Sequence, residues 1–206
     1  MPVIRTEEFV SGWQTGPFSG VSKTPWEITN QAEELIANEV QKLSADYVVE
    51  NQIAIHRTAI VEPYATLKGP LIIGENCFVG NGAYLRGGVF LDKDCIIGPS
   101  CEAKTLFMFE GSKIAHLSFV GDSIIGCRVN IEAGAIVANY RNEMTSKRIK
   151  FMWRGNIVDT GQDKFGALIA DGVRLGANSV VAPGAILESG FKLDRLGLVD
   201  LHPDAK

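Results

Sequence analysis

One histidine and two asparagines stand out in the stretch GSKIAHLSFVGDSIIGCRVNIEAGAIVANY, which runs from Gly111 to Tyr140. His116 carries an imidazole, a group that gains or loses a proton near neutral pH. Asn130 and Asn139 carry amides, which can donate hydrogen bonds to a carbonyl oxygen as it becomes negative. Six-residue repeats surround all three side chains, and a repeat built only for packing needs none of them. We therefore expect the function to lie in this stretch.

Two cations precede the histidine at a spacing that matches the repeat. Arg86 and Lys104 are separated by the length of three six-residue repeats. If three repeats form one coil, both side chains leave the same edge of the protein in adjacent coils. Stacked cations are costly without solvent or an anion, and a phosphate is the natural partner. The alternative is two solvated surface cations beside a structural histidine. We favour function for His116 because it follows these cations at a break in the repeat.

The elements that position these residues follow from a period of six. Nine apolar residues recur at this period without a miss: Val61, Leu67, Ile73, Val79, Leu85, Leu91, Ile97, Ala103 and Phe109. This periodicity predicts a β-helix, in which three short strands form a triangular coil of about 18 residues. Cys77, Cys95 and Cys101 fall on a second six-residue series, so we expect them in the coil interior. The predicted fold class is all-β, with one amino-terminal helix.

The repeat is interrupted twice after Phe109. Ile125 and the repeats after it are out of phase with Phe109, so we expect a break within residues 110–124. Residues 141–166 are polar and rich in Lys and Arg, and we expect one long loop or hairpin ejected from a corner of the coil. From Arg195 the repeat is lost, and the tail is expected to cap the last coil.

The amino-terminal segment precedes the repeats. Residues 1–22 have no clear period, and we expect their aromatic side chains to pack on a neighbouring subunit. Thr24, Pro25 and Glu27 supply an N-cap, a proline at the first helical position and a capping-box carboxylate. Apolar residues then recur at helical spacing to about Leu43, which predicts one amphipathic helix whose apolar face needs a partner. We divide the chain into residues 1–48 (arm and helix), 49–195 (β-helix) and 196–206 (tail).

The composition indicates a globular protein without a nucleic-acid or membrane partner. Of the 206 residues, 46% are hydrophobic and 21% are charged. A net charge of −4 gives no electrostatic reason to bind nucleic acid or an anionic membrane. The first residues lack a basic region followed by an apolar run, and no window resembles a membrane span. We expect a cytoplasmic protein whose four cysteines are buried thiols.

A metal site and a nucleotide-binding loop are both disfavoured. Zinc held between subunits would need several histidines at compatible levels, but His56 and His202 lie far along the chain from His116, in irregular ends. No cysteine pair has CxxC spacing. Neither GxGxxG between a strand and a helix nor GxxxxGK[ST] occurs. We expect no metal.

Longer motifs carry a family resemblance. Lys104 is followed by GSKIAHLSFVGD and IIGCRVNIEAGAIVANY, and LRGG occupies 85–88. These motifs closely resemble the acetyltransferase domain of the bifunctional N-acetylglucosamine-1-phosphate uridylyltransferase/glucosamine-1-phosphate acetyltransferase family. PWE at 25–27 and residues 158–184 are similar to archaeal-type sugar-1-phosphate nucleotidylyltransferases with a β-helix tail. The resemblance spans roughly residues 24–190. It implies a left-handed parallel β-helix, a homotrimer with active sites between subunits, acetyl-CoA as donor and glucosamine 1-phosphate as acceptor.

The resemblance also implies roles for single residues. His116 matches the general base, which would take a proton from the acceptor amine. The positions that match sugar-phosphate-binding residues are Arg86, Lys104, Asn130 and Lys164. The positions that match the lining of the acetyl-CoA site are Ala133, Asn139 and Tyr140.

The sequence departs from the family at several points. Phe119 replaces a tyrosine three residues after the histidine, and Glu132 replaces a glycine beside Asn130. The carboxy-terminal repeats do not match the coenzyme-A-binding end, and the uridylyltransferase motif LAAGxGTRM is absent. We predict an acetyl-CoA-dependent N-acetyltransferase acting on an amino-sugar phosphate, on the route to UDP-N-acetylglucosamine. Two alternatives stay open: an acyltransferase acting on a nucleotide-linked amino sugar, or a non-catalytic trimeric partner of a separate nucleotidylyltransferase.

Overall fold

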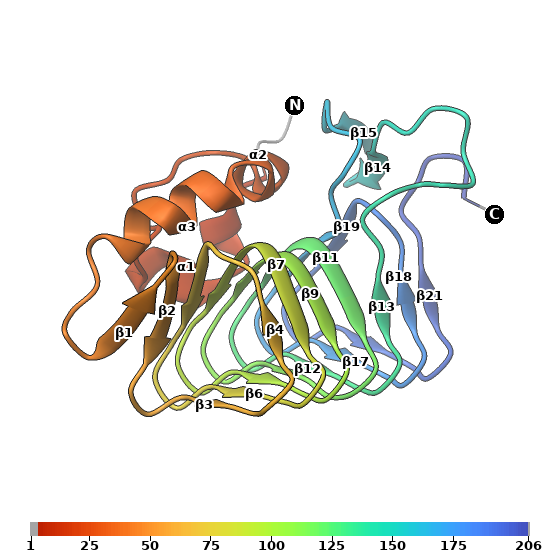
Figure 1. Ribbon diagram of the computed structural model, residues 1–206. Helices are drawn as coiled ribbons and strands as arrows, with labels where there is room; N and C mark the ends of the chain where they lie inside the picture. The colour runs from red at the N-terminus through yellow and green to blue at the C-terminus, as the bar shows by residue number, and fades with distance from the viewer. Residues whose placement is uncertain (1–3, 206) are drawn as a thin grey trace.

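The computed structural model describes residues 4–205 and shows a parallel β-helix with helices and a hairpin packed on it (Figure 1). The coils stack so that each strand pairs with the strand one coil further on. Val61 pairs with Val79, and Val79 pairs with Ile97, so partners are three repeats apart as expected. The apolar residues of these strands fill the coil interior and form its core. The predicted β-helix is confirmed.

The coil has three sides, which we number in the order in which the chain meets them from β3 onward. Side 1 is a seven-stranded sheet: β3 (Ile60–Val61), β6 (Phe78–Val79), β8 (Ile96–Ile97), β10 (Lys113–Ile114), β12 (Asn130–Ile131), β17 (Arg174–Leu175) and β20 (Lys192–Leu193). Three strands run around the corner from side 2 to side 3: β7 (Tyr84–Leu91), β9 (Glu102–Met108) and β11 (Phe119–Ile125). Side 2 also contains β4 (Thr66–Leu67), β13 (Ile136–Val137), β18 (Val180–Val181) and β21 (Leu198–Val199). Side 3 also contains β1 (Tyr47–Glu50), β2 (Ile53–His56), β5 (Leu71–Ile73), β16 (Ala167–Ile169) and β19 (Ala185–Leu187).

The repeat shortens at the corner between sides 2 and 3. Arg86 pairs with Lys104, three full repeats on, whereas Lys104 pairs with Gly121, which falls one position short of three repeats. In β7 this corner consists of two residues, Gly87 and Gly88. In β9 it consists of Thr105 alone, and in β11 of Asp122 alone. The left-handed backbone of Thr105 (φ 55°) and Asp122 (φ 44°) makes the tighter turn possible.

These two shortenings correct the break expected within residues 110–124. Only Asp122 lies in that range, and His116 lies at a regular corner rather than inside a break. The six-residue period placed the break too late because Phe107 and Phe109, which seemed to continue it, point out of the coil. Both pack under the amino-terminal segment. Their apolar character continued the period of six after the inward positions had already moved to Leu106 and Met108.

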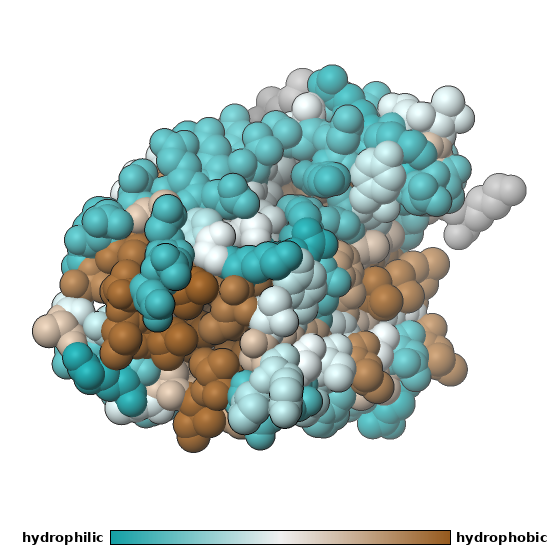
Figure 2. Space-filling model, viewed as in Figure 1, coloured by the Kyte–Doolittle hydropathy of each residue, from teal (hydrophilic) through white to brown (hydrophobic). Residues whose placement is uncertain are grey.

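The amino-terminal segment covers side 3 of its own chain. It contains η1 (Thr6–Glu8), α1 (Ser11–Thr15), α2 (Pro25–Asn30) and α3 (Ala32–Val40). The capping box of Thr24 and Glu27 is present as predicted, but Gln31 divides the expected single helix into α2 and α3. The outer surface of these helices is hydrophilic (Figure 2). Their inner face, including the fully buried Ile28 and Ile36, packs on side 3.

Burial within one chain corrects the expectation of a neighbouring subunit for this segment. Trp13 and Phe18 are 1% and 2% exposed. They stack on each other and contact Phe107 of side 3. A partner subunit is therefore not needed to cover the arm or the helices.

The ejected segment is confirmed and contains the hairpin of β14 (Lys150–Trp153) and β15 (Asn156–Asp159). Arg154 and Gly155 form its two-residue turn, both with positive φ, as the tight turn between twisted strands requires. Phe151 is fully buried and packs edge-on against Trp26 of α2. After Val199 the chain leaves the coil, and the carbonyl of Leu201 accepts a hydrogen bond from the N–H of Met152 in the hairpin.

All four cysteines are buried free thiols. Cys77, Cys95 and Cys101 lie in the coil interior as predicted, whereas Cys127 lies under the amino-terminal segment. Burial raises the pKa of the Cys101 and Cys127 thiols. Across residues 4–205, no helix combines the length and the apolar character needed to cross a membrane.

Candidate functional site

The corner between sides 2 and 3 carries the predicted cations. Arg86 and Lys104 project from paired positions on β7 and β9, as their spacing predicted. The next position in this row is Gly121. Because glycine has no side chain, Asn139 and Phe119 can occupy the space beside its backbone. A Cβ at Gly121 would lie 2.7 Å from Nδ2 of Asn139 and 2.8 Å from Cζ of Phe119. Glycine therefore allows the side chains of neighbouring coils to meet at this corner.

Asp122 links two of the predicted residues. Its Oδ1 lies 2.7 Å from Nζ of Lys104, and its Oδ2 accepts a hydrogen bond from Nδ2 of Asn139. Its side chain is only 9% exposed, and its carbonyl accepts a hydrogen bond from the N–H of Gly166. Both carboxylate oxygens are thus engaged, and Asp122 fixes Lys104 relative to Asn139. Sequence reasoning missed this residue, because its role depends on the left-handed turn that it forms.

Five predicted residues meet around one pocket at this corner. Its volume is about 460 Å³, and its lining consists of Arg86, Lys104, Phe119, Asn139, Tyr140 and Lys164. The positive charges are only partly compensated. Arg86 pairs with Glu102 at 2.7 Å, and Lys104 pairs with Asp122. Within residues 4–205, Lys164 forms no ion pair. The pocket is therefore suited to an anion.

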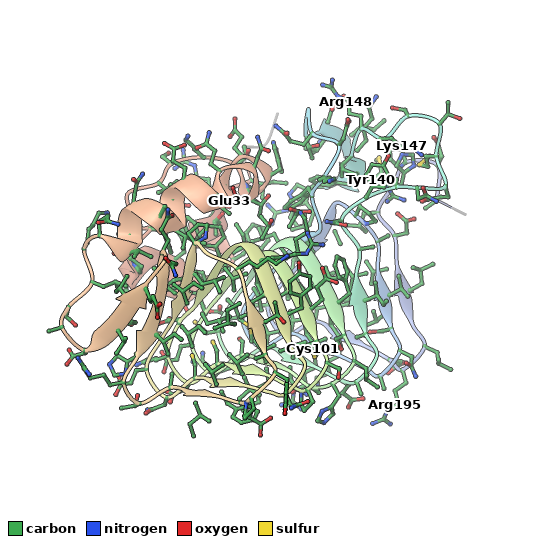
Figure 3. The ribbon with its side chains drawn as sticks, in the orientation of Figure 1. Glu33, Cys101, Tyr140, Lys147, Arg148 and Arg195 are labelled. Carbon is green, nitrogen blue, oxygen red and sulfur yellow. The ribbon has the colours of Figure 1, made fainter. Side chains whose placement is uncertain are left out.

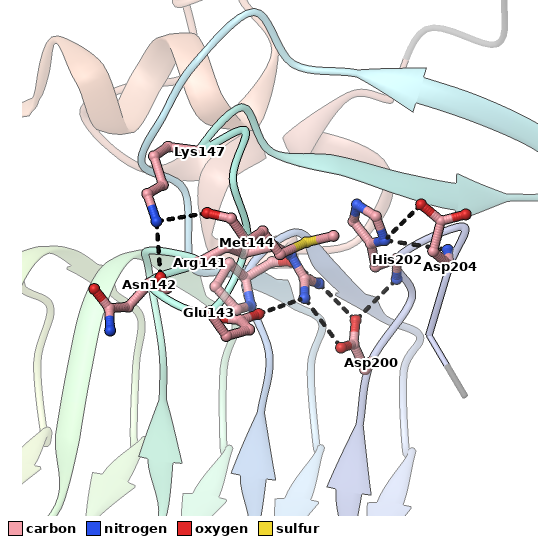
Figure 4. Close-up of polar contacts among 9 residues, drawn as sticks. Arg141, Asn142, Glu143, Met144, Lys147, Asp200, His202 and Asp204 are labelled. Carbon is pink, nitrogen blue, oxygen red and sulfur yellow. Dashed lines mark hydrogen bonds and ion pairs between the residues drawn. The ribbon is translucent and has the colours of Figure 1, made fainter.

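A buried arginine, Arg141, directly follows Tyr140 in the chain. Arg141 is 2% exposed, and its Nη1 and Nη2 bind the two carboxylate oxygens of Asp200 at 3.0 and 2.5 Å (Figure 4). Nη2 also donates to the carbonyl of Pro183 at 3.0 Å. The guanidinium holds the pKa of Asp200 below its usual range, although burial alone would raise it. The tail is thereby tied to the start of the ejected segment.

The other three predicted residues lie elsewhere on the chain. His116 is exposed at the corner between sides 1 and 2, across side 2 from the pocket. The carbonyl of His116 accepts a hydrogen bond from the N–H of Gly134 in the next coil. Ala133 therefore lies at the same corner as His116, one coil further on. Asn130 projects from side 1, between Lys113 and Arg174. A single chain therefore does not bring the histidine to the cations.

Side 1 carries a basic row that the sequence analysis did not single out. Lys113, Asn130, Arg174 and Lys192 occupy paired positions on four consecutive strands, and all are exposed. They line a groove of about 550 Å³. The sequence contained a pattern that could have predicted this row. Arg174 and Lys192 are one coil apart, and each directly precedes an inward leucine.

Glu132 does not leave an uncompensated negative charge in this groove. Its carboxylate binds Arg195 at 3.2 Å and accepts a hydrogen bond from the N–H of Ala177 at 2.9 Å. The glutamate that replaces the family glycine therefore joins neighbouring coils.

The chain is similar to known proteins over the region that contains these residues. Residues 69–187, more than half of the chain, match the family model described as GMPPB C-terminal domain. The chain belongs to the GMPPB C-terminal domain family. The chain is 37% identical over 142 residues to the bifunctional sugar-1-phosphate nucleotidylyltransferase/acetyltransferase of Sulfurisphaera tokodaii. It is 34% identical over 184 residues to the bifunctional protein GlmU of Methanococcus vannielii. The resemblance inferred from the motifs is confirmed.

The matches cover unequal shares of the proteins compared. They include 66% and 85% of this chain but only 35% and 43% of the two relatives. Among solved structures, the hexapeptide transferase family protein of Anaplasma phagocytophilum aligns with a TM-score of 0.51 at 17% identity. That alignment covers 73% of this chain and 79% of the other. The likeness supports the fold, a left-handed parallel β-helix, as predicted.

Proposed function

We propose that this protein is an acyltransferase that moves an acyl group from acyl-CoA to the amine of an amino-sugar phosphate. One observation carries the proposal: Arg86, Lys104, Asn139, Tyr140 and Lys164 meet in one pocket. The two relatives support it, because one is named as an acetyltransferase and the other as GlmU. Acetyl-CoA and glucosamine 1-phosphate are the simplest donor and acceptor of these classes, and we propose them as the first pair to test.

The pocket supports a role in binding the acceptor phosphate. Lys164 brings a positive charge that no carboxylate of residues 4–205 compensates within the chain. Arg86 presents a planar guanidinium, which can donate two hydrogen bonds to one phosphate. Asp122 keeps Lys104 at the pocket wall, so the ammonium is held in place before the phosphate arrives. We assign the phosphate to these three cations.

The basic row of side 1 supports an acyl-CoA donor. Coenzyme A carries a diphosphate and a separate phosphate, and each needs cationic partners. Lys113, Arg174 and Lys192 supply three cations along one groove, beside Asn130. Ala133 lies at the corner next to this groove, and we assign it to the donor site with Asn139 and Tyr140.

His116 is the proposed general base. The imidazole takes a proton from the acceptor amine, and the nitrogen lone pair forms a bond to the thioester carbonyl carbon. The carbon–sulfur bond then breaks, and coenzyme A leaves as a thiolate that accepts the proton. An amide such as that of Asn130 can stabilise the negative carbonyl oxygen formed between these steps.

The separation of His116 from the pocket supports a homotrimer with sites between subunits. Phe119, Ile136, Val180 and Leu198 form a row of outward side chains on side 2, in register from strand to strand. Leu198 is 64% exposed and Ile136 is 39% exposed. Hydrophobic residues are visible at the right of Figure 2, where Figure 1 places β13, β18 and β21. A neighbouring chain packed against this row would bury these apolar side chains. It would also bring a second set of site residues to side 2.

The test is thiol release from acetyl-CoA in the presence of glucosamine 1-phosphate. We expect His116→Ala to lower kcat by roughly 10²- to 10⁴-fold, with His56→Ala as the matched control. Lys104→Met should instead raise the KM for the acceptor, with Lys93→Met as its control, because Lys104 contributes ground-state binding. Near-normal turnover in His116→Ala would contradict its role as the base. If the parent protein releases no thiol with any amino-sugar phosphate, the non-catalytic partner subunit becomes the better explanation.

A further inference from the structure

A second pocket adjoins the cation site on the side away from His116. Its volume is about 490 Å³, and it lies between the coil corner and the junction of α2 and α3. Lys104 and Lys164 line both pockets, so the two ammonium groups belong to one continuous site. The volume falls within the range of small-molecule sites, about 300–1,000 Å³. The acceptor site thus continues past its phosphate-binding residues.

A close approach of α3 to the coil forms this second pocket. Gly88 has φ +83°, and a Cβ there would lie 2.8 Å from the backbone nitrogen of Glu33. Only glycine lets the start of α3 come this near to the corner. The result places Glu33 and Glu34 at the pocket rim, and Figure 3 shows Glu33 on the helix beside the upper edge of the coil. Glu33 and Glu34 make no ion pair within residues 4–205.

The lining of the second pocket is suited to hydroxyl groups. Every residue in it is polar or glycine: Thr29, Asn30, Gln31, Glu33, Glu34, Gly87, Lys104, Thr105, Asp122 and Lys164. Unpaired carboxylates accept hydrogen bonds from vicinal hydroxyls, as an acidic residue does from ribose in dinucleotide-binding folds. A lining without apolar residues is poorly suited to a lipid chain. A polar, hydroxyl-bearing group attached to the phosphate fits it.

We propose that the acceptor is an amino sugar linked through a diphosphate to a nucleoside. The sugar lies beside Phe119, towards His116, and the diphosphate lies on Lys104 and Lys164. The ribose hydroxyls bind Glu33 and Glu34. This inference rests on the proposed acyl transfer and specifies its acceptor class.

The experiment compares two acceptors that differ only by the nucleotide, glucosamine 1-phosphate and UDP-glucosamine. We expect kcat/KM for thiol release to be at least about tenfold higher with UDP-glucosamine, since hydrogen bonds to charged groups contribute at this scale. Glu33→Gln/Glu34→Gln should remove this preference and leave kcat/KM for glucosamine 1-phosphate within twofold. Glu39→Gln, on the same helix but outside the pocket, is the matched control. Binding of UDP, measured by calorimetry without acyl donor, should weaken about tenfold in the double variant only.

The outcomes separate this inference from the proposed function. Equal use of both acceptors, with no effect of the double variant, overturns the nucleotide site and leaves acyl transfer standing. No thiol release with either acceptor, but UDP binding that the double variant weakens, overturns acyl transfer and supports the nucleotide site. If neither thiol release nor UDP binding is observed, both proposals fail.

Discussion

Replacing Arg141 tests whether the link between tail and pocket stabilises the protein. The guanidinium is 2% exposed and makes two hydrogen bonds to Asp200 and one to Pro183. Arg141→Met keeps much of the side-chain volume but leaves the carboxylate of Asp200 without its partner. Because that carboxylate is 22% exposed, water can replace part of the lost interaction.

The expected loss is about 3 kcal/mol of unfolding free energy at pH 7, the low end of the range for breaking a buried ion pair. For a chain of this size, that lowers Tm by about 6–12 °C. Asp200→Asn should cost a similar amount, because the buried guanidinium loses its charged hydrogen bonds to Asp200 and keeps only the longer ion pair with Glu143, at 3.4 Å. The double variant should lose less than the sum of the two single losses, since it leaves no unpaired charge.

The same pair predicts a pH dependence with a defined sign. The pKa of Asp200 is lowered in the folded protein, so the unfolded chain binds its proton more readily. The stabilisation is complete above the unfolded carboxyl pKa, about 4, and is lost as the pH falls through the lower folded pKa. The difference between the parent protein and Arg141→Met should therefore shrink below about pH 4.

Urea unfolding followed by tryptophan fluorescence measures these differences at pH 7 and across pH 3–6. The KM for acetyl-CoA should also rise in Arg141→Met, because Tyr140 is next to Arg141 and is assigned to the donor site. An unfolding free energy within about 0.5 kcal/mol of the parent at pH 7 would refute the reasoning, since that is the scale of a neutral surface substitution.

Three further predictions concern the core, the thiols and the assembly. Ile36→Ala should lower the unfolding free energy by about 2–5 kcal/mol, because Ile36 is fully buried against side 3, and a loss below 1 kcal/mol in denaturant unfolding would contradict that packing. A thiol reagent should label the four buried cysteines much more slowly in the native protein than in urea, and rapid native labelling of all four would count against their burial. Ile136→Asp should leave the chain folded by circular dichroism but convert the proposed trimer to monomers in light scattering, because Ile136 is 39% exposed on side 2; a parent protein that is already monomeric would refute the trimer.

The coil was predictable because inward positions recur at a fixed spacing around one closed core. Val61, Val79 and Ile97 lie in register as the period required. The tighter corners at Thr105 and Asp122 were not predictable in the same way. Side 3 is apolar on both faces, since the amino-terminal segment covers its outer face, and a period of six cannot distinguish an inward phenylalanine from an outward one.

The helical segment shows a second limit of the sequence. Its apolar face was evident from residues such as Ile28 and Ile36, but an amphipathic pattern does not identify the surface that covers the face. The partner is side 3 of the same chain, whose own outward residues were hidden within the strand pattern.

The candidate site was predictable as far as the motifs extended. Spacing alone put Arg86 beside Lys104, and the resemblance added Asn139, Tyr140 and Lys164, which the fold gathers in one pocket. The roles of all eight predicted residues stay predictions, and three of these residues, His116, Asn130 and Ala133, lie away from the pocket. Their distance from the pocket depends on how chains assemble, and the motifs do not describe that.

The amino-terminal segment has a consequence for how the protein unfolds. In a bare solenoid each repeat touches only its neighbours, so repeats can melt one after another from an end. Here α3 contacts β5, β7 and β9, while α2 contacts β9 and β11. Two short helices thus connect four successive coils and add coupling beyond nearest neighbours. We expect these coils to exchange their amide hydrogens as one cooperative unit, and the last strands, β20 and β21, to open earlier.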